Sequence, residues 1–200
     1  MKNIIIAGIP LSGKTTLARK ILHNYPYNLI QDDILDCAIE AMYLKYISEQ
    51  NEEGAYIIKI PELIEIEDYV LERYFDISST DNIYYGTILE TYRLNMEKLK
   101  EYEENGAIVI VLGCADLTHD EFFENVRAYE TPLERTYYLS NFKLDMAVKS
   151  YVKDSREQRK KCQELGLTYI ETSHDREASI EKAYQIIKEK LKETKKVSID

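Results

Sequence analysis

The sequence feature that most constrains the fold is the segment Gly8–Thr15, which fits the pattern G-x-x-x-x-G-K-[ST] at every required position. An apolar, β-branched run precedes it at residues 3–7, as expected of a strand buried on both faces of a sheet. Apolar residues at helical spacing follow it, beginning with Leu17 and Ala18. The alternative, a glycine turn beside an exposed lysine, would need all three features to coincide by accident. The segment therefore predicts a strand–loop–helix unit that surrounds a phosphate with backbone N–H groups and a helix N-terminus.

Individual residues of this loop have distinct expected roles. The Lys14 ammonium is expected to reach the β- and γ-phosphates of ATP, and the Thr15 hydroxyl to bind Mg²⁺. The residues expected to bind the nucleotide are Gly8, Leu11, Ser12, Gly13, Lys14, Thr15 and Thr16.

Composition limits the classes of protein to which the chain can belong. A length of 200 residues with 44% hydrophobic residues suits a single domain with a full core. The net charge of -10 disfavours non-specific binding to nucleic acid or to an anionic membrane. The three cysteines are odd in number and far apart, and no zinc-ligand spacing joins them to the histidines, which indicates reduced thiols inside a cell. Without a signal sequence or a membrane-length apolar run, the sequence predicts a cytoplasmic protein, and it leaves a homodimer open.

Two adjacent carboxylates, Asp32 and Asp33, follow a short second strand predicted over residues 27–30. In open α/β sheets, ligands bind at the carboxyl ends of the strands, so at least one of these aspartates is expected to face the ligand. The alternative is that one of them caps the next helix. Both interpretations hold if one aspartate caps while the other faces the cleft.

The middle of the chain is predicted to be mostly helical. Residues 34–46 have helical spacing, and residues 56–60 fit either a strand or a loop into another helix. Apolar residues then recur as one helical face at Ile88, Leu89, Tyr92, Met96 and Leu99. Residues 34–105 thus form a helical insertion between two sheet strands, far longer than an ordinary crossover, and are expected to bind the substrate.

The last part of the chain alternates strands and helices. Strands are predicted over 107–112 and 167–172, and a helix over 120–129 follows a capping box that begins at Thr118. Asp116 is interpreted as part of the loop before that helix. Signals conflict over 131–139, and a strand over 136–139 is favoured. A basic helical stretch at 141–165 is expected to act as a lid, although a solvated helix face explains most of its lysines.

This alternation predicts an α/β fold with three layers: a parallel five-stranded sheet with helices on both faces, in a single domain over 1–200. With the phosphate loop, the Asp pair and the basic helix placed, the chain resembles the P-loop small-molecule kinases. Residues 1–36 are similar to nicotinamide riboside and uridine kinases, to polynucleotide 5′-hydroxyl kinases and to zeta toxins. The polynucleotide kinases carry an arginine shortly after the Asp pair, whereas Ile34, Leu35 and Asp36 follow here.

The resemblance implies roles for further residues. Asp32 would be the base or orienting group for the acceptor hydroxyl, and Asp33 the second choice for that role and a candidate near Mg²⁺. Arg156 and Arg159 lie where the family's lid supplies arginines to the transferred phosphate, and the loop 172–176 resembles the one that lies against adenine.

These observations predict an ATP- and Mg²⁺-dependent kinase whose acceptor is a small, nucleoside- or nucleotide-like molecule. The alternatives are a P-loop NTPase switch that acts through a protein partner, and a toxin-like kinase held by an antitoxin. A GTPase would carry an N-K-x-D motif, which the sequence lacks.

Overall fold

The computed structural model describes residues 1–47, 49–50, 56–57, 59–81, 85–130 and 135–197. At its centre is a sheet of five parallel strands in the order β2-β5-β1-β6-β7. The strands are β1 (Ile4–Gly8), β2 (Tyr27–Gln31), β5 (Gly86–Thr91), β6 (Ile108–Gly113) and β7 (Tyr169–Glu171). Because β1 lies between β5 and β6, the loop after β1 leaves the middle of the sheet.

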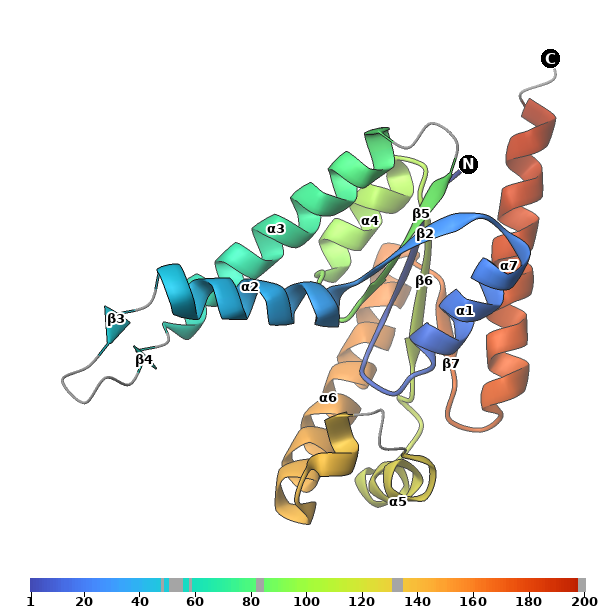
Figure 1. The fold of residues 1–200 in the computed structure, drawn as a ribbon. Coiled ribbons are helices and arrows are strands. Elements are labelled where there is room, and N and C mark those ends of the chain that lie inside the picture. The colour runs from blue at the N-terminus through green and yellow to red at the C-terminus, as the bar shows by residue number, and fades with distance from the viewer. Residues whose placement is uncertain (48, 51–55, 58, 82–84, 131–134, 198–200) are drawn as a thin grey trace.

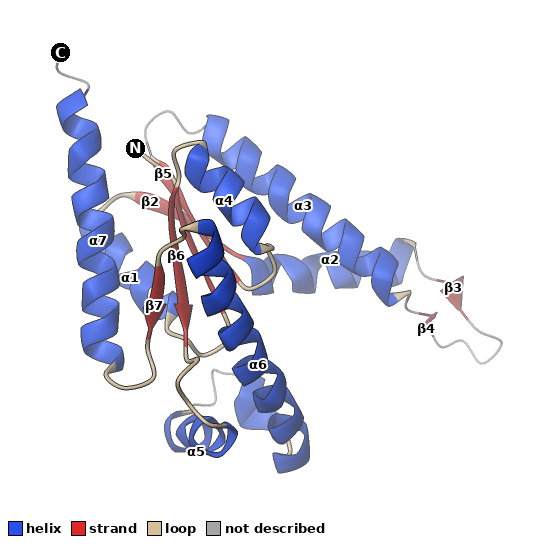
Figure 2. Ribbon diagram, turned by 180° about the vertical axis from the view of Figure 1, so that it is seen from behind, coloured by secondary structure: helices blue, strands red, loops and turns tan. Residues whose placement is uncertain are grey.

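Helices cover both faces of this sheet, as the sequence predicted (Figures 1 and 2). Alternate side chains of β1 point to opposite faces: Ile4 and Ile6 pack on one side, Ile5 and Ala7 on the other. The first side is covered by α1 (Lys14–Asn24) and α7 (Arg176–Val197), the second by α3 (Ile60–Asp81), α4 (Met96–Glu104) and α6 (Asn141–Leu165). The predicted three-layer α/β fold is therefore confirmed.

Two groups of elements extend from the carboxyl ends of the strands. One is α2 (Asp32–Tyr46) with α3, which project to one side in Figure 1 and carry a small antiparallel pair, β3 (Glu49–Gln50) and β4 (Tyr56–Ile57), at the tip. The other is α5 (His119–Tyr129) with the 3₁₀ helix η1 (Arg135–Tyr138) and the first half of α6. In the described residues, no helix is long and apolar enough to cross a membrane.

The predicted helix over 88–99 is wrong at its start. Residues 86–91 form β5, whose six residues are all buried between β2 and β1. A buried strand and a buried helical face both place apolar residues in short runs, so the spacing of Ile88, Leu89 and Tyr92 could not distinguish them. The helical segment between β2 and β5 therefore ends before Gly86, and the insertion expected over 34–105 includes a strand of the main sheet.

The strand predicted over 136–139 is also wrong, because this segment forms η1 and the turn into α6. The sheet still has five strands, because β5 is present in addition to the four other strands that the sequence predicted. Residues 131–134 lie outside the described residues. The capping box is confirmed: the Thr118 hydroxyl and the Glu121 carboxylate satisfy each other's backbone N–H groups at the start of α5.

Candidate active site

The phosphate loop follows β1 in the conformation that its glycines allow. Gly8 has φ 138°, and a Cβ there would lie 1.9 Å from the Leu112 carbonyl oxygen on β6, so no other residue fits. Gly13 has φ 102° and immediately precedes α1, which begins at Lys14. Leu11 also has a positive φ, of 67°, which is uncommon for a residue with a side chain and marks a tightly constrained loop.

The loop contains polar groups that suit a phosphate. Ser12 is fully buried, and its hydroxyl has no hydrogen-bond partner among the described residues. The Lys14 ammonium donates to the Ile9 carbonyl oxygen at 3.0 Å. Burial lowers the pKa of Lys14, while Glu90, Asp32 and Asp33 oppose this shift. A buried orphan hydroxyl beside a lysine and a helix N-terminus fits an anionic phosphate group.

Glu90 is a site residue that the sequence analysis missed. It lies near the end of β5, is 7% exposed, and accepts a hydrogen bond from the Thr15 hydroxyl. The Gln31 amide donates to its other carboxylate oxygen at 3.0 Å. A hydroxyl and a carboxylate beside the phosphate loop are the oxygen ligands that Mg²⁺ prefers, so these residues fit the ion. The sequence feature that could have revealed Glu90 is the β-branched run around Ile88, because it fits a buried strand as well as the predicted helix.

The two aspartates expected at the second strand occupy different environments. Asp32 is 3% exposed, and its Oδ2 accepts the Tyr92 backbone N–H at 2.6 Å. Asp33 is exposed. The residue at the N-cap of α2 is Gln31, which makes no capping hydrogen bond through its side chain, so neither aspartate caps this helix. Asp32, fixed in the site, and Asp33, open to solvent, both lie close enough to Lys14 to raise its pKa.

Arg156 and Arg159 both point from α6 toward the loop after β6. Arg156 donates to the carbonyl oxygens of Ala115 at 3.2 Å and Leu117 at 3.1 Å. Arg159 pairs with Asp116 and lies 3.5 Å from a Glu171 carboxylate oxygen. Arg159 is thus held by carboxylates, whereas the contacts of Arg156 are with neutral carbonyls.

The structural interpretation of Asp116 agrees with its contacts, which are to Arg159 and, at 3.4 Å, to His174. Arg159 and His174 hold the pKa of Asp116 below its ordinary value, the Arg159 hydrogen bond contributing most. Asp116 therefore connects the loop after β6 to α6 and to the loop after β7.

A cavity of about 550 Å³ opens beside the phosphate loop. Leu11 forms part of its wall, and the loop 172–176 after β7 lies opposite α5. The Ser173 hydroxyl at this cavity is buried without a partner in the described part of the chain. The volume, the apolar side chains of Leu117 and Phe122 and the polar loop suit a planar base next to the phosphate site.

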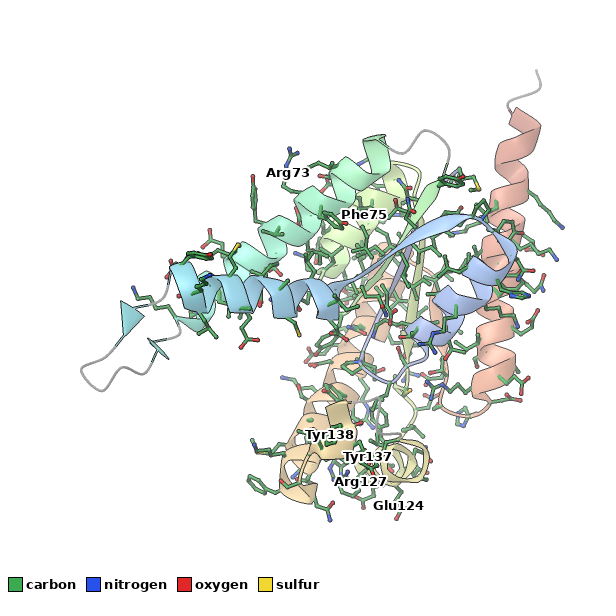
Figure 3. The ribbon with its side chains drawn as sticks, in the orientation of Figure 1. Arg73, Phe75, Glu124, Arg127, Tyr137 and Tyr138 are labelled. Atoms are coloured by element: carbon green, nitrogen blue, oxygen red, sulfur yellow. The ribbon has the colours of Figure 1, made fainter. Side chains whose placement is uncertain are left out.

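Arg127 holds together the elements on the other side of this cavity. From α5, its guanidinium donates to the Leu139 carbonyl oxygen at 2.8 Å and to Asn141 Oδ1 at 2.9 Å. In Figure 3 the labelled Arg127, Tyr137 and Tyr138 all lie in the group formed by α5, η1 and the start of α6. Farther along α6, Ser155 and Cys162 are fully buried. A movement of the expected lid 141–165 would therefore have to leave the second half of α6 in place.

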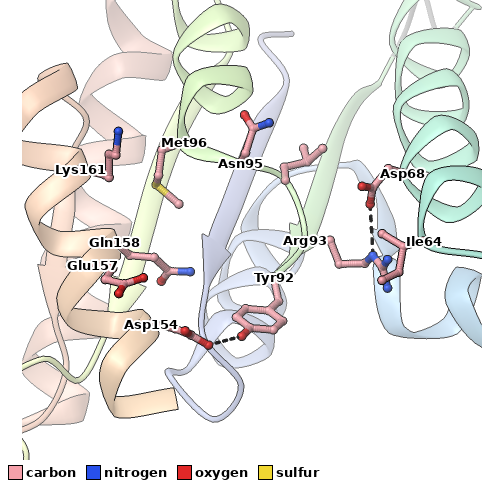
Figure 4. Close-up of a pocket in the computed structure, with 11 residues that line it drawn as sticks. Ile64, Asp68, Tyr92, Arg93, Asn95, Met96, Asp154, Glu157, Gln158 and Lys161 are labelled. Carbon is pink, nitrogen blue, oxygen red and sulfur yellow. Dashed lines mark hydrogen bonds and ion pairs between the residues drawn. The ribbon is translucent and has the colours of Figure 1, made fainter. Parts of the chain in front are cut away.

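A second cavity, of about 510 Å³, lies between α3, the residues after β5 and α6 (Figure 4). Tyr92 is at its centre, and the Tyr92 hydroxyl donates to Asp154 of α6 at 2.5 Å. The backbone N–H of the same residue binds Asp32. This cavity therefore adjoins the carboxylate that was expected to orient the acceptor.

No protein-family model matches the chain. A curated shikimate kinase from Clostridium botulinum (strain 657 / Type Ba4) is 37% identical over 107 residues, which cover 50% of this chain and 55% of that protein. The chain thus spans about half the length of this curated relative.

Solved structures of kinases are similar over nearly the whole chain. A shikimate kinase from Bacteroides thetaiotaomicron has a TM-score of 0.53 at 16% identity, covering 94% of this chain and 98% of that one. A gluconokinase from Sinorhizobium meliloti 1021 has a TM-score of 0.51 at 13% identity, covering 93% and 95%. A sugar kinase from Janibacter sp. HTCC2649 has a TM-score of 0.56 at 13% identity, covering 92% and 93%.

Structural similarity at such low sequence identity shows a shared fold and nothing more specific. It does not support the narrower resemblance to nicotinamide riboside kinases, zeta toxins and the other families named with them. The parallel sheet, its strand order and the phosphate loop together have the fold of the shikimate kinase and gluconokinase type of P-loop kinases.

Proposed function

We propose that the protein is an ATP- and Mg²⁺-dependent kinase that transfers the γ-phosphoryl group to a hydroxyl of a small molecule. One observation carries the proposal: the Thr15 hydroxyl, the Glu90 carboxylate and the buried Asp32 carboxylate gather at the carboxyl edge of the sheet, beside a complete phosphate loop. Kinase chemistry needs these groups, because catalysis of phosphoryl transfer consists mainly of positioning and charge neutralisation.

Each residue has a part in the proposed reaction. The loop amides, Ser12 and Lys14 hold the β- and γ-phosphates, and Thr15 with Glu90 would hold Mg²⁺ either directly or through its water. When bound, the ion supplies positive charge to the phosphate oxygens. Asp33 is exposed and close enough to affect the pKa of Lys14, so it would be a candidate partner for water around the ion.

Asp32 is the group we assign to the acceptor. The Tyr92 backbone N–H binds its Oδ2 and so fixes the carboxylate in the site. The acceptor oxygen forms a bond to the γ-phosphorus, the bond from this phosphorus to the β,γ-bridging oxygen breaks, and ADP leaves. The hydroxyl proton passes to Asp32. Arg156, whose present partners are neutral carbonyls, can turn to the transferred group without breaking an ion pair.

The relatives' names make a small polyhydroxylated acceptor the first class to test, because shikimate and gluconate both belong to it. The sequence favoured a nucleoside- or nucleotide-like acceptor, and that narrower class stays a prediction.

The test is acceptor-dependent ADP release, with ³¹P NMR to identify the phosphorylated product. Lys14→Ala controls for transfer that does not depend on the phosphate loop, since it removes charge from the phosphate site without removing core packing. This variant should lose nearly all phosphoryl transfer. ATP hydrolysis that no small acceptor stimulates, with a stable nucleotide-bound complex with another protein, would instead favour an NTPase switch.

A further inference from the structure

The guanidinium of Arg93, in the loop after β5, is bound on every side by carboxylates. Its Nη2 lies 2.7 Å from Glu67, its Nη1 3.2 Å from Asp36 and its Nε 3.3 Å from Asp68. The side chain is 22% exposed and lines the cavity of Figure 4. Each of its three nitrogens already faces a carboxylate, so an acidic ligand that approached Arg93 would meet neighbouring negative charge.

Lys161, the other cation among the described residues of the cavity lining, also has carboxylate partners. Lys161 lies 3.1 Å from Glu97 and 3.8 Å from Glu164. Arg159 pairs with Asp116 and Glu171, outside the cavity lining. Among the described residues, each cation that lines the cavity therefore already faces carboxylates, and an anionic acceptor would have to compete with them.

Carboxylates outnumber these cations in the cavity lining, although each has partners of its own: Asp68 pairs with Arg93, the Asp154 Oδ2 accepts from Tyr92 and Ser150, and Glu157 lies 3.8 Å from Lys153. Asp154 and Glu157 of α6 line the cavity. The Gln158 Oε1 at its wall is buried and has no hydrogen-bond donor among the described residues. Asp36 Oδ1, beside Arg93, is in the same condition. Buried oxygens without partners are costly, and a ligand that brings N–H or O–H groups would satisfy them.

The charge around Asp36 agrees with this imbalance. Burial raises the pKa of Asp36 to about 6; Arg93 opposes the shift, while the neighbouring Glu67 and Asp32 add to it. The interaction with Asp32 also places this cluster next to the residue assigned to the acceptor hydroxyl. The negative charge therefore extends from the phosphate loop into the cavity.

We propose that the acceptor is a hydroxylated amine, whose ammonium group lies among Asp68, Asp154 and Glu157 while a neighbouring hydroxyl faces Asp32. This inference rests on the proposed kinase function and narrows it. It separates the protein from kinases named for acids such as shikimate and gluconate, and the same charge argument disfavours nucleotide acceptors.

The experiment compares acceptors in matched sets that share a carbon skeleton and differ in one group. One set is glucosamine, glucose and gluconate; others pair amino cyclitols with cyclitols, amino alcohols with diols, and shikimate with its amine analogue. The measured quantity is kcat/KM for acceptor-dependent ADP release. We expect the amine to be the best member of every set that is turned over. A carboxylate or neutral compound that exceeds its amine counterpart overturns the inference and leaves the kinase function intact.

A different outcome is that no compound stimulates ADP release although the protein binds ATP in equilibrium dialysis. This result would count against the proposed small-molecule kinase function. The two failures are therefore distinguishable.

Two variants test the cavity itself. Asp68→Asn removes a half-exposed carboxylate and frees the Arg93 Nε, and Glu157→Gln neutralises the facing side. Each should lower kcat/KM for the amine by about 10- to 100-fold, the usual range for a lost charged hydrogen bond, with a smaller effect on the neutral counterpart. Asp68→Asn should also raise the relative rate of the acid.

The control is Glu72→Gln, one turn farther along α3, where the carboxylate pairs with Lys98 outside the cavity lining. It changes the charge of the same helix and should leave the preference among acceptors unchanged. Equal losses for amine and neutral acceptors in Asp68→Asn and Glu157→Gln, at unchanged thermal stability, would also overturn the inference.

Discussion

The backbone N–H of Tyr92 holds the Asp32 carboxylate at 2.6 Å, and the hydroxyl of the same tyrosine holds Asp154 of α6 at 2.5 Å. Tyr92, the residue that follows β5, therefore connects Asp32, which we assign to the acceptor, with α6, the helix that carries Arg156. The Tyr92 ring also packs edge-on against Tyr151, with 6.4 Å between ring centroids. This link gives Tyr92 a positioning role and leads to the first prediction.

Tyr92→Phe should lower kcat by about tenfold, the effect of losing one hydrogen bond to a charged group, and change KM for ATP little. The ring packing stays, so the thermal stability should fall only slightly. Tyr69→Phe, on an exposed face of α3, is the control. Normal turnover of Tyr92→Phe would contradict the positioning role.

Asp32→Asn should reduce kcat much more than it weakens ATP binding, since a general base or orienting group contributes about 10²- to 10⁴-fold. Asp33→Asn should have a milder effect, because Asp33 is exposed while Asp32 is fixed by Tyr92. Steady-state kinetics and separate ATP-binding measurements distinguish the two effects. The reverse order of the two kcat values would mean that the roles of the pair are exchanged.

Glu90→Gln should raise the Mg²⁺ concentration needed for half-maximal activity by about tenfold or more, because the neutral amide is a weaker partner for a hard cation than the carboxylate. Saturating Mg²⁺ should restore part of the rate. The control is Glu104→Gln, an exposed position on α4. An unchanged Mg²⁺ titration curve would remove Glu90 from the metal site.

Arg156→Lys and Arg159→Lys keep the charge but lose the planar fork, and both should lower kcat more than they raise KM for ATP. The loss should be larger for Arg156, since Arg159 is tied to Asp116 and Glu171. Hydrogen exchange of residues 143–161 should slow when ATP and acceptor bind together. Unchanged exchange with near-normal turnover of both variants would leave these arginines as surface charge.

The raised pKa of Asp36 leads to a prediction about how the stability of the fold depends on pH. Its pKa in the folded protein is raised from 3.8 to about 6, mainly by burial, so the folded state binds a proton more tightly than the unfolded state. The contribution of Asp36 to the free energy of unfolding should therefore decrease as pH rises through this interval. Chemical denaturation of the wild type and Asp36→Asn at several pH values measures it. Parallel stability curves for the two proteins would contradict the assignment.

The sequence alone was sufficient where the signal is local. The segment Gly8–Thr15 predicted β1, the loop and α1, because its glycines and its flanking apolar pattern specify backbone conformation residue by residue. The helix expected over 141–165 is present as α6, and it ends at Gly166, a glycine in the left-handed conformation. Asp32 was predicted as a site residue because it directly follows a recognisable strand.

Tertiary structure decided the rest of the site. Residues 86–91 are a strand because they pair with β1 on one side and β2 on the other, and no pattern within the segment indicates those partners. Pairing brings Glu90 to Thr15, 75 residues away, and places Tyr92 and Arg93 beside α2, α3 and α6. The sequence thus predicted the loop at which phosphate is expected to bind, whereas the charge of the neighbouring cavity depends on contacts between segments far apart in the chain.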